Sequence, residues 1–177
     1  IDGYTPLFIA STQRHIEAVR LLVEAGASVD QAMEDGATPL FIAAQNGHLE
    51  VVRALVEAGA SVDQANKNGT TPLFIASQFG HIEVVRFLLD SGAVLSKCMS
   101  GNGWSPLFVS AWSGHAEVVQ ELLKRGADAS VATQSDHLGV PAGSTTLIIA
   151  SEKGHVEVVR LLVEAGASVD QANNDGA

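Results

Sequence analysis

The sequence predicts an all-α solenoid in which short helix–turn–helix pairs stack side by side and β-hairpin fingers join successive pairs. Three observations predict it: one motif recurs along the whole chain, each copy holds two apolar segments, and glycines separate these segments. A histidine marks each copy, at His15, His48, His81, His115 and His155, and the spacings are 33, 33, 34 and 40 residues. A helix pair this small cannot bury its own apolar surface, so it must stack on copies of itself.

The third copy, residues 69–93, shows how the first helix of each pair is specified. Thr71 is a good N-cap because its hydroxyl accepts from a free backbone N–H of the first turn. Pro72 follows at the first helical position, where its missing N–H carries no penalty. Gly80 can adopt the left-handed conformation that ends a short helix. We therefore expect a helix of about two turns from Pro72 to about Phe79.

The second helix of this copy is expected to begin at His81 and to end before Gly92. Its apolar side chains recur at helical spacing and form a wide arc: Ile82, Val84, Val85, Phe87, Leu88 and Leu89. An arc this wide indicates a helix that is covered on more than one side. This pattern is what stacking between neighbouring pairs requires.

The copies form a single domain with units at about residues 1–33, 34–66, 67–100, 101–140 and 141–177. Between regular units, Asp35-Gly36 and Asn68-Gly69 are signals of tight hairpin turns. Arg14 stands where the other copies have glycine before the histidine. We expect an adjusted turn there, because a residue with a Cβ is strained in a left-handed conformation.

Two connections and the last copy depart from the regular pattern. The finger before the fourth copy is one residue longer than its neighbours, and the next finger is seven residues longer. The inserted part lies within residues 130–142, where glycine and proline indicate a loop. The last copy is as apolar as the interior ones, although solenoids need polar caps. We therefore expect a piece of a longer array, with end-to-end self-association through its uncapped terminal repeats.

The 33-residue period, with Thr-Pro-Leu, Gly-His and Leu-Leu-x-x-Gly-Ala motifs, resembles the ankyrin repeat over essentially the whole chain. The resemblance implies a non-enzymatic protein-recognition module that contacts its partner through finger tips and the exposed ends of first helices, on the concave side. One departure is systematic, because the histidine that the family usually has after Thr-Pro-Leu is replaced: Phe8, Phe41, Phe74, Phe108 and Ile148. We expect an apolar ladder there, with Phe41 and Phe74 buried.

Charge and cysteine content restrict the partners and the compartment. The net charge is −10, from 20 acidic and 10 basic residues, and no basic run is present. Nucleic acid and anionic membrane are therefore poor partners, and a basic or amphipathic protein or peptide is favoured. Alternatively, the charge only keeps an extended solenoid soluble. A single cysteine, Cys98, forms no intrachain disulfide and fits an intracellular, cytoplasmic location, and no apolar run is long enough to insert into a membrane.

No residue pattern indicates catalysis, a cofactor or a metal. Equivalent histidines of stacked helices are about 8–10 Å apart, too far for one metal ion with bonds of about 2 Å. Glutamates two residues after the histidines and arginines three residues later are expected to form surface ion pairs: Glu17–Arg20, Glu50–Arg53, Glu83–Arg86 and Glu157–Arg160. Cys98 as a nucleophile would need a nearby base, and the repeated structural role of His115, the nearest histidine in sequence, argues against it.

Two other interpretations of function remain open beside partner recognition. These repeats can be a structural spacer of a long array, with no ligand of their own. They can also be an engineered scaffold, because residues 20–32 and 160–172 are the same thirteen residues. The irregular fourth copy argues for a natural sequence.

Aromatic residues at variable surface positions predict the partner-binding site. Both tryptophans and Phe79 fall in the third and fourth copies, at positions that are otherwise mostly polar. We expect Phe79, Trp104 and Trp112 to line one exposed patch, because tryptophan is enriched at interface hot spots. The predicted site residues are Phe79, Trp104, Trp112, Asn102, Gln78, Asn46 and Tyr4. The alternative is that the longer fingers fold back and bury both tryptophans as local core.

Overall fold

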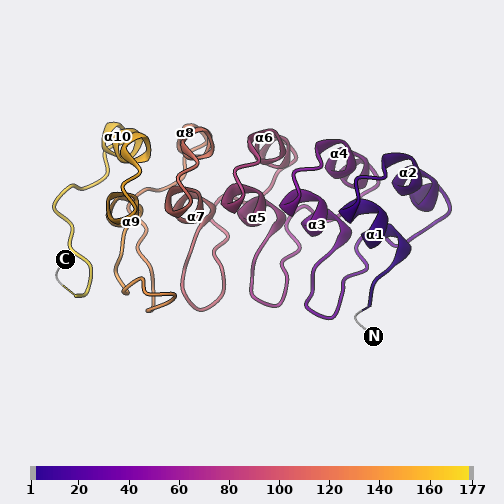
Figure 1. The fold of residues 1–177 in the computed structure, drawn as a ribbon, viewed down its shortest axis with the longest axis horizontal. Coiled ribbons are helices and arrows are strands. Elements are labelled where there is room, and N and C mark those ends of the chain that lie inside the picture. Colours follow the sequence, from indigo (N-terminus) through magenta and orange to yellow (C-terminus); the bar gives the residue numbers. More distant parts are fainter. Residues whose placement is uncertain (1–2, 176–177) are drawn as a thin grey trace.

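The computed structural model describes residues 3–175, which form ten helices stacked as five pairs (Figure 1). The first helices of the pairs lie in the layer next to the fingers: α1 (Pro6–Thr12), α3 (Pro39–Gln45), α5 (Pro72–Gln78), α7 (Pro106–Trp112) and α9 (Thr146–Glu152). The second helices form the outer layer: α2 (Ile16–Glu24), α4 (Leu49–Glu57), α6 (Ile82–Asp90), α8 (Ala116–Lys124) and α10 (Val156–Glu164). The predicted solenoid is confirmed. Its outermost residues, 1–2 and 176–177, lie outside the described part.

The helix caps are those that the sequence specifies. Thr71 has extended backbone, and its Oγ1 accepts from Phe74 N at 3.2 Å. α5 ends at Gln78, one residue earlier than expected, and Gly80 takes a φ of +75° after it. The same threonine or serine cap precedes every other first helix. Local sequence therefore sets the length of these helices.

Four of the recurring histidines, those of repeats two to five, connect their repeat to the preceding one. Each donates from Nε2 to a carbonyl oxygen at the end of the neighbouring first helix: His48 to Thr12 at 3.1 Å, His81 to Gln45 at 2.9 Å, His115 to Gln78 at 3.0 Å and His155 to Trp112 at 3.0 Å. Each ring also lies close to the helix-ending glycine of the preceding repeat where one is present. A Cβ on Gly80, for example, would be 2.6 Å from His115 Nδ1. These histidines therefore hold the stack together. In residues 3–175, no group of three His, Cys, Asp or Glu side chains could hold a metal ion.

Arg14 shows what happens where this glycine is missing. Its φ is +59°, in the left-handed region, so the turn keeps the geometry that glycine gives elsewhere. Its guanidinium Nη2 lies 3.3 Å from Glu50 Oε2, in an exposed pair between neighbouring repeats. Left-handed backbone is unfavourable by about 1–2 kcal/mol for a residue with a Cβ, whereas an exposed ion pair contributes about 0–1 kcal/mol.

We expect Arg14→Gly to stabilise the chain by about 0.5–1 kcal/mol, because relief of this strain exceeds the greater freedom of glycine in the unfolded chain. Urea denaturation followed by circular dichroism measures the change. Arg14→Ala is the matched control, because it removes the ion pair and keeps the strained backbone. Equal stability of the two variants would show that backbone strain at this position is negligible.

The core is continuous along the stack and contains the phenylalanine ladder. Buried leucines and valines of both helix layers form its main cluster, with Leu40, Leu73 and Leu107 as examples. The ladder members Phe8, Phe41, Phe74 and Phe108 are buried, whereas Ile148 is half-buried. The expected burial of Phe41 and Phe74 is therefore confirmed.

The fingers are turns that hydrogen-bond to one another in a row. The two regular fingers are each closed by two backbone bonds, such as Asn66 N to Thr70 O at 3.0 Å and Gly69 N to Asn66 O at 2.9 Å. Residues 3–175 contain isolated β-bridges but no strand. Neighbouring fingers are joined in series by backbone bonds: Lys67 N to Asp35 O, Ser100 N to Asn68 O, Gln134 N to Asn102 O and Asn174 N to Ala142 O. Each finger therefore covers part of the next one.

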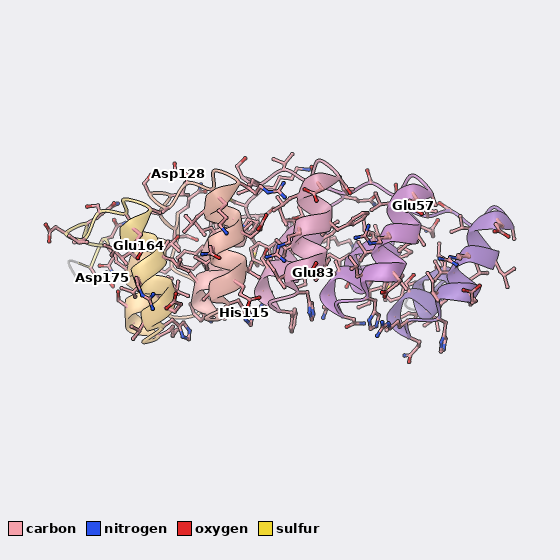
Figure 2. All side chains as sticks on the ribbon, turned by 90° about the horizontal axis from the view of Figure 1, so that it is seen from above. Glu57, Glu83, His115, Asp128, Glu164 and Asp175 are labelled. Atoms are coloured by element: carbon pink, nitrogen blue, oxygen red, sulfur yellow. The ribbon has the colours of Figure 1, made fainter. Side chains whose placement is uncertain are left out.

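Ion pairs lie along the outer helices, which Figure 2 shows from above with Glu57 and Glu83 labelled. The expected pairs Glu17–Arg20, Glu83–Arg86 and Glu157–Arg160 are present. The expected pair of Glu50 with Arg53 is wrong: Glu50 pairs with Arg14 instead, and the Arg53 guanidinium lies 4.5 Å above the Phe87 ring. Between repeats three and four the pairs form a network: Arg86–Glu121, Glu121–Arg125 and Arg125–Asp90.

Candidate functional site

The inserted finger between α8 and α9 has a tight hairpin at its tip (Figure 1). His137 and Val140 exchange both backbone hydrogen bonds, at 3.0 and 2.9 Å. The two residues between them have left-handed backbone, with φ of +49° at Leu138 and +79° at Gly139. Positive φ at both central residues is the geometry of a two-residue type I′ turn. The insertion is thus an ordered structure beside the fourth finger.

Trp104 lies beneath this hairpin and is only 5% exposed. Its ring centroid lies 5.0 Å from that of Trp112, 5.2 Å from that of Phe108 and 5.3 Å from that of His137, which it meets edge-on. Val140 of the hairpin is buried in the same cluster. The prediction of an exposed Trp104 is therefore wrong, because the longer fingers fold back and cover it.

Trp112 is half-buried against that cluster, and the Lys153 ammonium lies 4.5 Å above its ring. Asn102 is also buried, contrary to the expectation of an exposed finger-tip residue. Its Oδ1 accepts from Trp104 N at 3.0 Å, and its Nδ2 lies 3.6 Å from Met99 Sδ. This asparagine closes the turn of the fourth finger, a local role that side-chain amides often have in turns.

The other predicted residues are more exposed but do not gather in one place. Phe79 is 48% exposed and stacks on the His81 ring with centroids 6.3 Å apart. Asn46 is exposed and donates from Nδ2 to Thr12 O at 3.3 Å, and exposed Tyr4 meets the Phe8 ring edge-on. No contact joins Phe79 to the tryptophans among the ring contacts of the described residues.

A cavity of about 240 Å³ lies where the third and fourth fingers, α5 and the inserted hairpin come together. Phe74 and Ile75 of α5 and Val109 of α7 give it an apolar lining. Trp104 and Gln78 also line it, so two of the predicted site residues do meet here. We call this space the finger cavity.

The remaining lining of the finger cavity is polar at one side and apolar at the hairpin. Asn66, Asn68 and Thr70 contribute from the third finger, whereas His137 and Leu138 contribute from the inserted one. No Asp, Glu, Lys or Arg lines it. Sequence reasoning missed Leu138, although a leucine before glycine in a polar insertion was a visible signal. It also missed Ile75 of α5, because nothing in the sequence sets this position apart as part of a site.

Trp104 contributes an unusual feature to the finger cavity. Its indole Nε1 is buried, and no acceptor for it exists among residues 3–175. Buried polar groups almost always have a hydrogen-bond partner. This N–H is closed off from solvent, so it is an unsatisfied donor within the packed interior.

Cys98 lies in a different place and has the wrong properties for a nucleophile. It lines an apolar recess of about 130 Å³ together with Leu95, Leu107 and Val131. Burial raises the pKa of its thiol, so the reactive thiolate is less populated than in an exposed cysteine. The site with binding features is the finger cavity.

Comparison with known proteins agrees with this arrangement of stacked pairs and fingers. A family model of three ankyrin repeat copies matches residues 1–66 and 59–133, and a single-repeat model matches residues 142–174. The chain belongs to the ankyrin repeat family. No curated protein matched the chain. Ankyrin repeats are generally non-enzymatic protein–protein interaction modules.

The finger cavity lies where the fingers meet the first helices. The ion pairs of α6 and α8 occupy the outer layer instead. None of the helices within residues 3–175 is both long enough and apolar enough to cross a bilayer.

Proposed function

We propose that this ankyrin chain recognises a protein or peptide partner and that the partner binds over the finger cavity, on the concave face of repeats three and four. The observation that carries the proposal is the cavity itself: a mainly apolar hollow lined by three helices and three fingers. Exposed Phe79 at the end of α5 extends the apolar surface. A structural spacer without a ligand would need neither the cavity nor an exposed phenylalanine beside it.

The charges around the cavity support a basic or amphipathic partner. Glu34, Asp35 and Asp136 are exposed on neighbouring fingers and outnumber the exposed Lys67 of the third finger, whereas the cavity lining has no carboxylate. A partner with an apolar segment flanked by Lys or Arg would match both regions. A cytoplasmic location, expected from the single cysteine, stays a prediction.

We expect Gln78→Arg to weaken partner binding at least about tenfold, which corresponds to about 1.4 kcal/mol. Gln78 lines the finger cavity, and a guanidinium there would fill it and repel a basic partner. Affinity capture from cells of the source organism identifies the partner, and titration of the purified pair gives the affinities.

Gln120→Arg is the matched control, because exposed Gln120 lies on α8 of the outer layer. It introduces the same side chain at a position where the other repeats already have arginine. Equal binding by the wild type and both variants would place the contact elsewhere and favour the spacer interpretation.

A second proposal concerns self-association through α9 and α10. An apolar hollow of about 400 Å³ is lined there by Leu147, Ile148, Val159, Val163 and Val169, and Val163 is 45% exposed. Residues 160–172 are identical to residues 20–32, which in the first repeat pack against the second repeat. The proposed occupant is the first repeat of another copy of the chain. This repeat closely resembles the second repeat, against which the identical segment packs within one chain.

We expect the mean mass of the wild type to rise with concentration in sedimentation equilibrium and Val163→Lys to remain monomeric. The ammonium group of the introduced lysine would be buried without a partner in the stacked interface, which disfavours association. Val156→Lys is the control, because exposed Val156 does not line the hollow. A wild type that stays monomeric at high concentration would contradict the proposal.

A further inference from the structure

The same thirteen residues stand in two different environments of the stack. Residues 20–32 belong to the first repeat and residues 160–172 to the fifth, and these repeats lie at opposite ends of the rod (Figure 1). The second repeat packs on one side of the first segment, and the fourth repeat packs on the opposite side of the second segment. Identical side chains therefore show which surface is open at each end.

The exposures of the two segments are complementary. Leu21 is 65% exposed, whereas its counterpart Leu161 is half-buried against the core. The order reverses further along, because Val169 is 67% exposed and its counterpart Val29 is half-buried. Each end of the rod thus presents the apolar surface that the other end has covered.

The junction between repeats three and four shows how two such surfaces meet. Leu95 of the third repeat lines the same recess as Leu107 and Ala127 of the fourth. Leu95 stands three residues after the glycine that follows α6, Leu107 is the second residue of α7, and Ala127 directly follows the glycine after α8. One repeat supplies the first position, and the next repeat supplies the other two.

The two ends of the rod hold these positions separately. Leu7 and Ala27, which correspond to Leu107 and Ala127, line a hollow of about 220 Å³ on the first repeat. Val169, which corresponds to Leu95, lines the hollow of about 400 Å³ on the fifth repeat. The ends are therefore the two halves of an interior junction.

The histidine bonds between repeats point to the same pairing. Each interior histidine reaches the carbonyl three residues before the preceding histidine, as His115 does at Gln78 O and 3.0 Å. His15 is exposed, and its ring makes no hydrogen bond within residues 3–175. At the other end, the same spacing selects Glu152 O, which no histidine of the described chain binds. Nothing lies within 4 Å of a Cβ added to Gly154, so the place for a histidine ring beside it is open.

An aspartate bond repeats the pattern at another point of the junction. Asp30 Oδ1 accepts from Ser61 N of the next repeat at 3.0 Å, and the second and third repeats make the same bond. Asp170, the counterpart of Asp30 in the identical segment, is exposed and has no partner within residues 3–175. Ser28 N, the counterpart of Ser61 N, donates to no acceptor in that part of the chain. An acceptor at one end thus matches a donor at the other.

We infer that copies of this chain stack head to tail in the register of an interior junction, so that His15 of one copy donates to Glu152 O of the next and Ser28 N donates to Asp170. This inference rests on the self-association proposed above. It adds the register, two named hydrogen bonds and the mode of growth.

Head-to-tail stacking does not stop at a dimer. The two surfaces differ and lie at opposite ends of the rod, so a pair of copies still has one open surface of each kind. Further copies add in series, as repeats do within one chain.

Two lysine variants block one end each and test the inference. Leu21→Lys blocks the first repeat and Val169→Lys blocks the fifth, because a buried ammonium without a partner disfavours association. Both positions are exposed, so neither lysine should disturb the fold. In sedimentation velocity we expect the wild type to grow beyond a dimer with concentration and each variant alone to stay monomeric. An equal mixture of the two variants should form a dimer and nothing larger, because one usable surface of each kind remains.

Val94→Lys is the matched control and should associate like the wild type. Val94 is 42% exposed, as a terminal valine is, but it lies in the third repeat, away from both ends. Loss of association in this variant would show that an added positive charge anywhere on the rod prevents stacking, and the end-specific inference would fail.

Solution NMR of the mixed dimer tests the register. In isotope-labelled Val169→Lys, the His15 ring signals should shift on addition of unlabelled Leu21→Lys, whereas those of His137 should not. With the labels exchanged, the amide of Gly154 should shift and His15 should not. If the variants fail to fold, the His15 signals of the wild type should shift with concentration. Unchanged His15 signals in associated protein would overturn the inference.

Two sedimentation results separate the inference from the proposal beneath it. If Leu21→Lys associates by itself, like ends join, so α9 and α10 still form the interface but the head-to-tail register is wrong. A mixture of the two variants that stays monomeric, although the wild type associates, also overturns the register. A wild type that is monomeric at high concentration contradicts both the register and the self-association.

Discussion

Phe74→Ala is expected to destabilise the chain by about 3–5 kcal/mol, the usual range for truncation of a buried phenylalanine. Phe74 is 3% exposed and packs in the cluster that contains Trp104, Phe108 and Val140. The deletion would leave a void between repeats three and four that the rigid helix caps around Thr71 cannot close. Urea denaturation followed by circular dichroism gives the free energy of unfolding.

Phe79→Ala is the control for this prediction, because it removes the same side chain five residues later at an exposed position. We expect it to change stability by about 0.5 kcal/mol or less, as for most surface substitutions. A loss below about 1 kcal/mol for Phe74→Ala would show that this ladder position is not a core position.

Gly80→Ala is expected to be the next most harmful substitution, at about 2–5 kcal/mol. Its φ of +75° makes any L residue strained, by about 1–2 kcal/mol. The new Cβ would also lie 2.6 Å from His115 Nδ1. Overpacking of this kind adds about 1–3 kcal/mol and would displace the ring from its bond to Gln78 O.

Gly154→Ala separates the two contributions. It has nearly the same backbone, with a φ of +73°, but nothing lies within 4 Å of its added Cβ. We expect this variant to lose only the stability that backbone strain removes. In thermal unfolding, Gly80→Ala should therefore have a clearly lower melting temperature than Gly154→Ala. Equal losses for the two variants would mean that the histidine ring moves aside without penalty.

The sequence predicted the fold well because each unit carries its own local signals. Thr71 and Pro72 specify where α5 begins, and the left-handed glycine Gly80 specifies where it ends. These signals act over a few residues and do not depend on neighbours. The same holds for the histidines, whose role follows from recurrence at a constant position.

The site was harder to predict because burial in the fingers depends on neighbouring repeats. The position of Trp104 is occupied in other fingers by Ala37, Thr70 and Ser144, which looked like surface residues and are all buried. Tyr4, at the same position of the first finger, is exposed. Small and hydroxyl side chains there reflect crowding between fingers, which no single repeat reveals.

The inserted hairpin could not be placed from the sequence for a different reason. The insertion has no counterpart in the other copies, so recurrence says nothing about it. Its position depends on contacts of His137 and Val140 with Trp104 and the core around it. Those contacts join residues more than thirty positions apart in the chain.

The ion-pair network between α6 and α8 has a mechanical consequence. Glu121 lies between Arg86 and Arg125, and Arg125 also binds Asp90, so both helices must separate several charges at once to come apart. In a solenoid, stability is a sum of repeats and nearest-neighbour interfaces. Under tension between its ends, such a rod would lengthen one repeat at a time, and these ion pairs would add to the resistance of the junction between repeats three and four. Dissolved salt, which screens charges at the surface, would make the rod more compliant at its middle than at its ends.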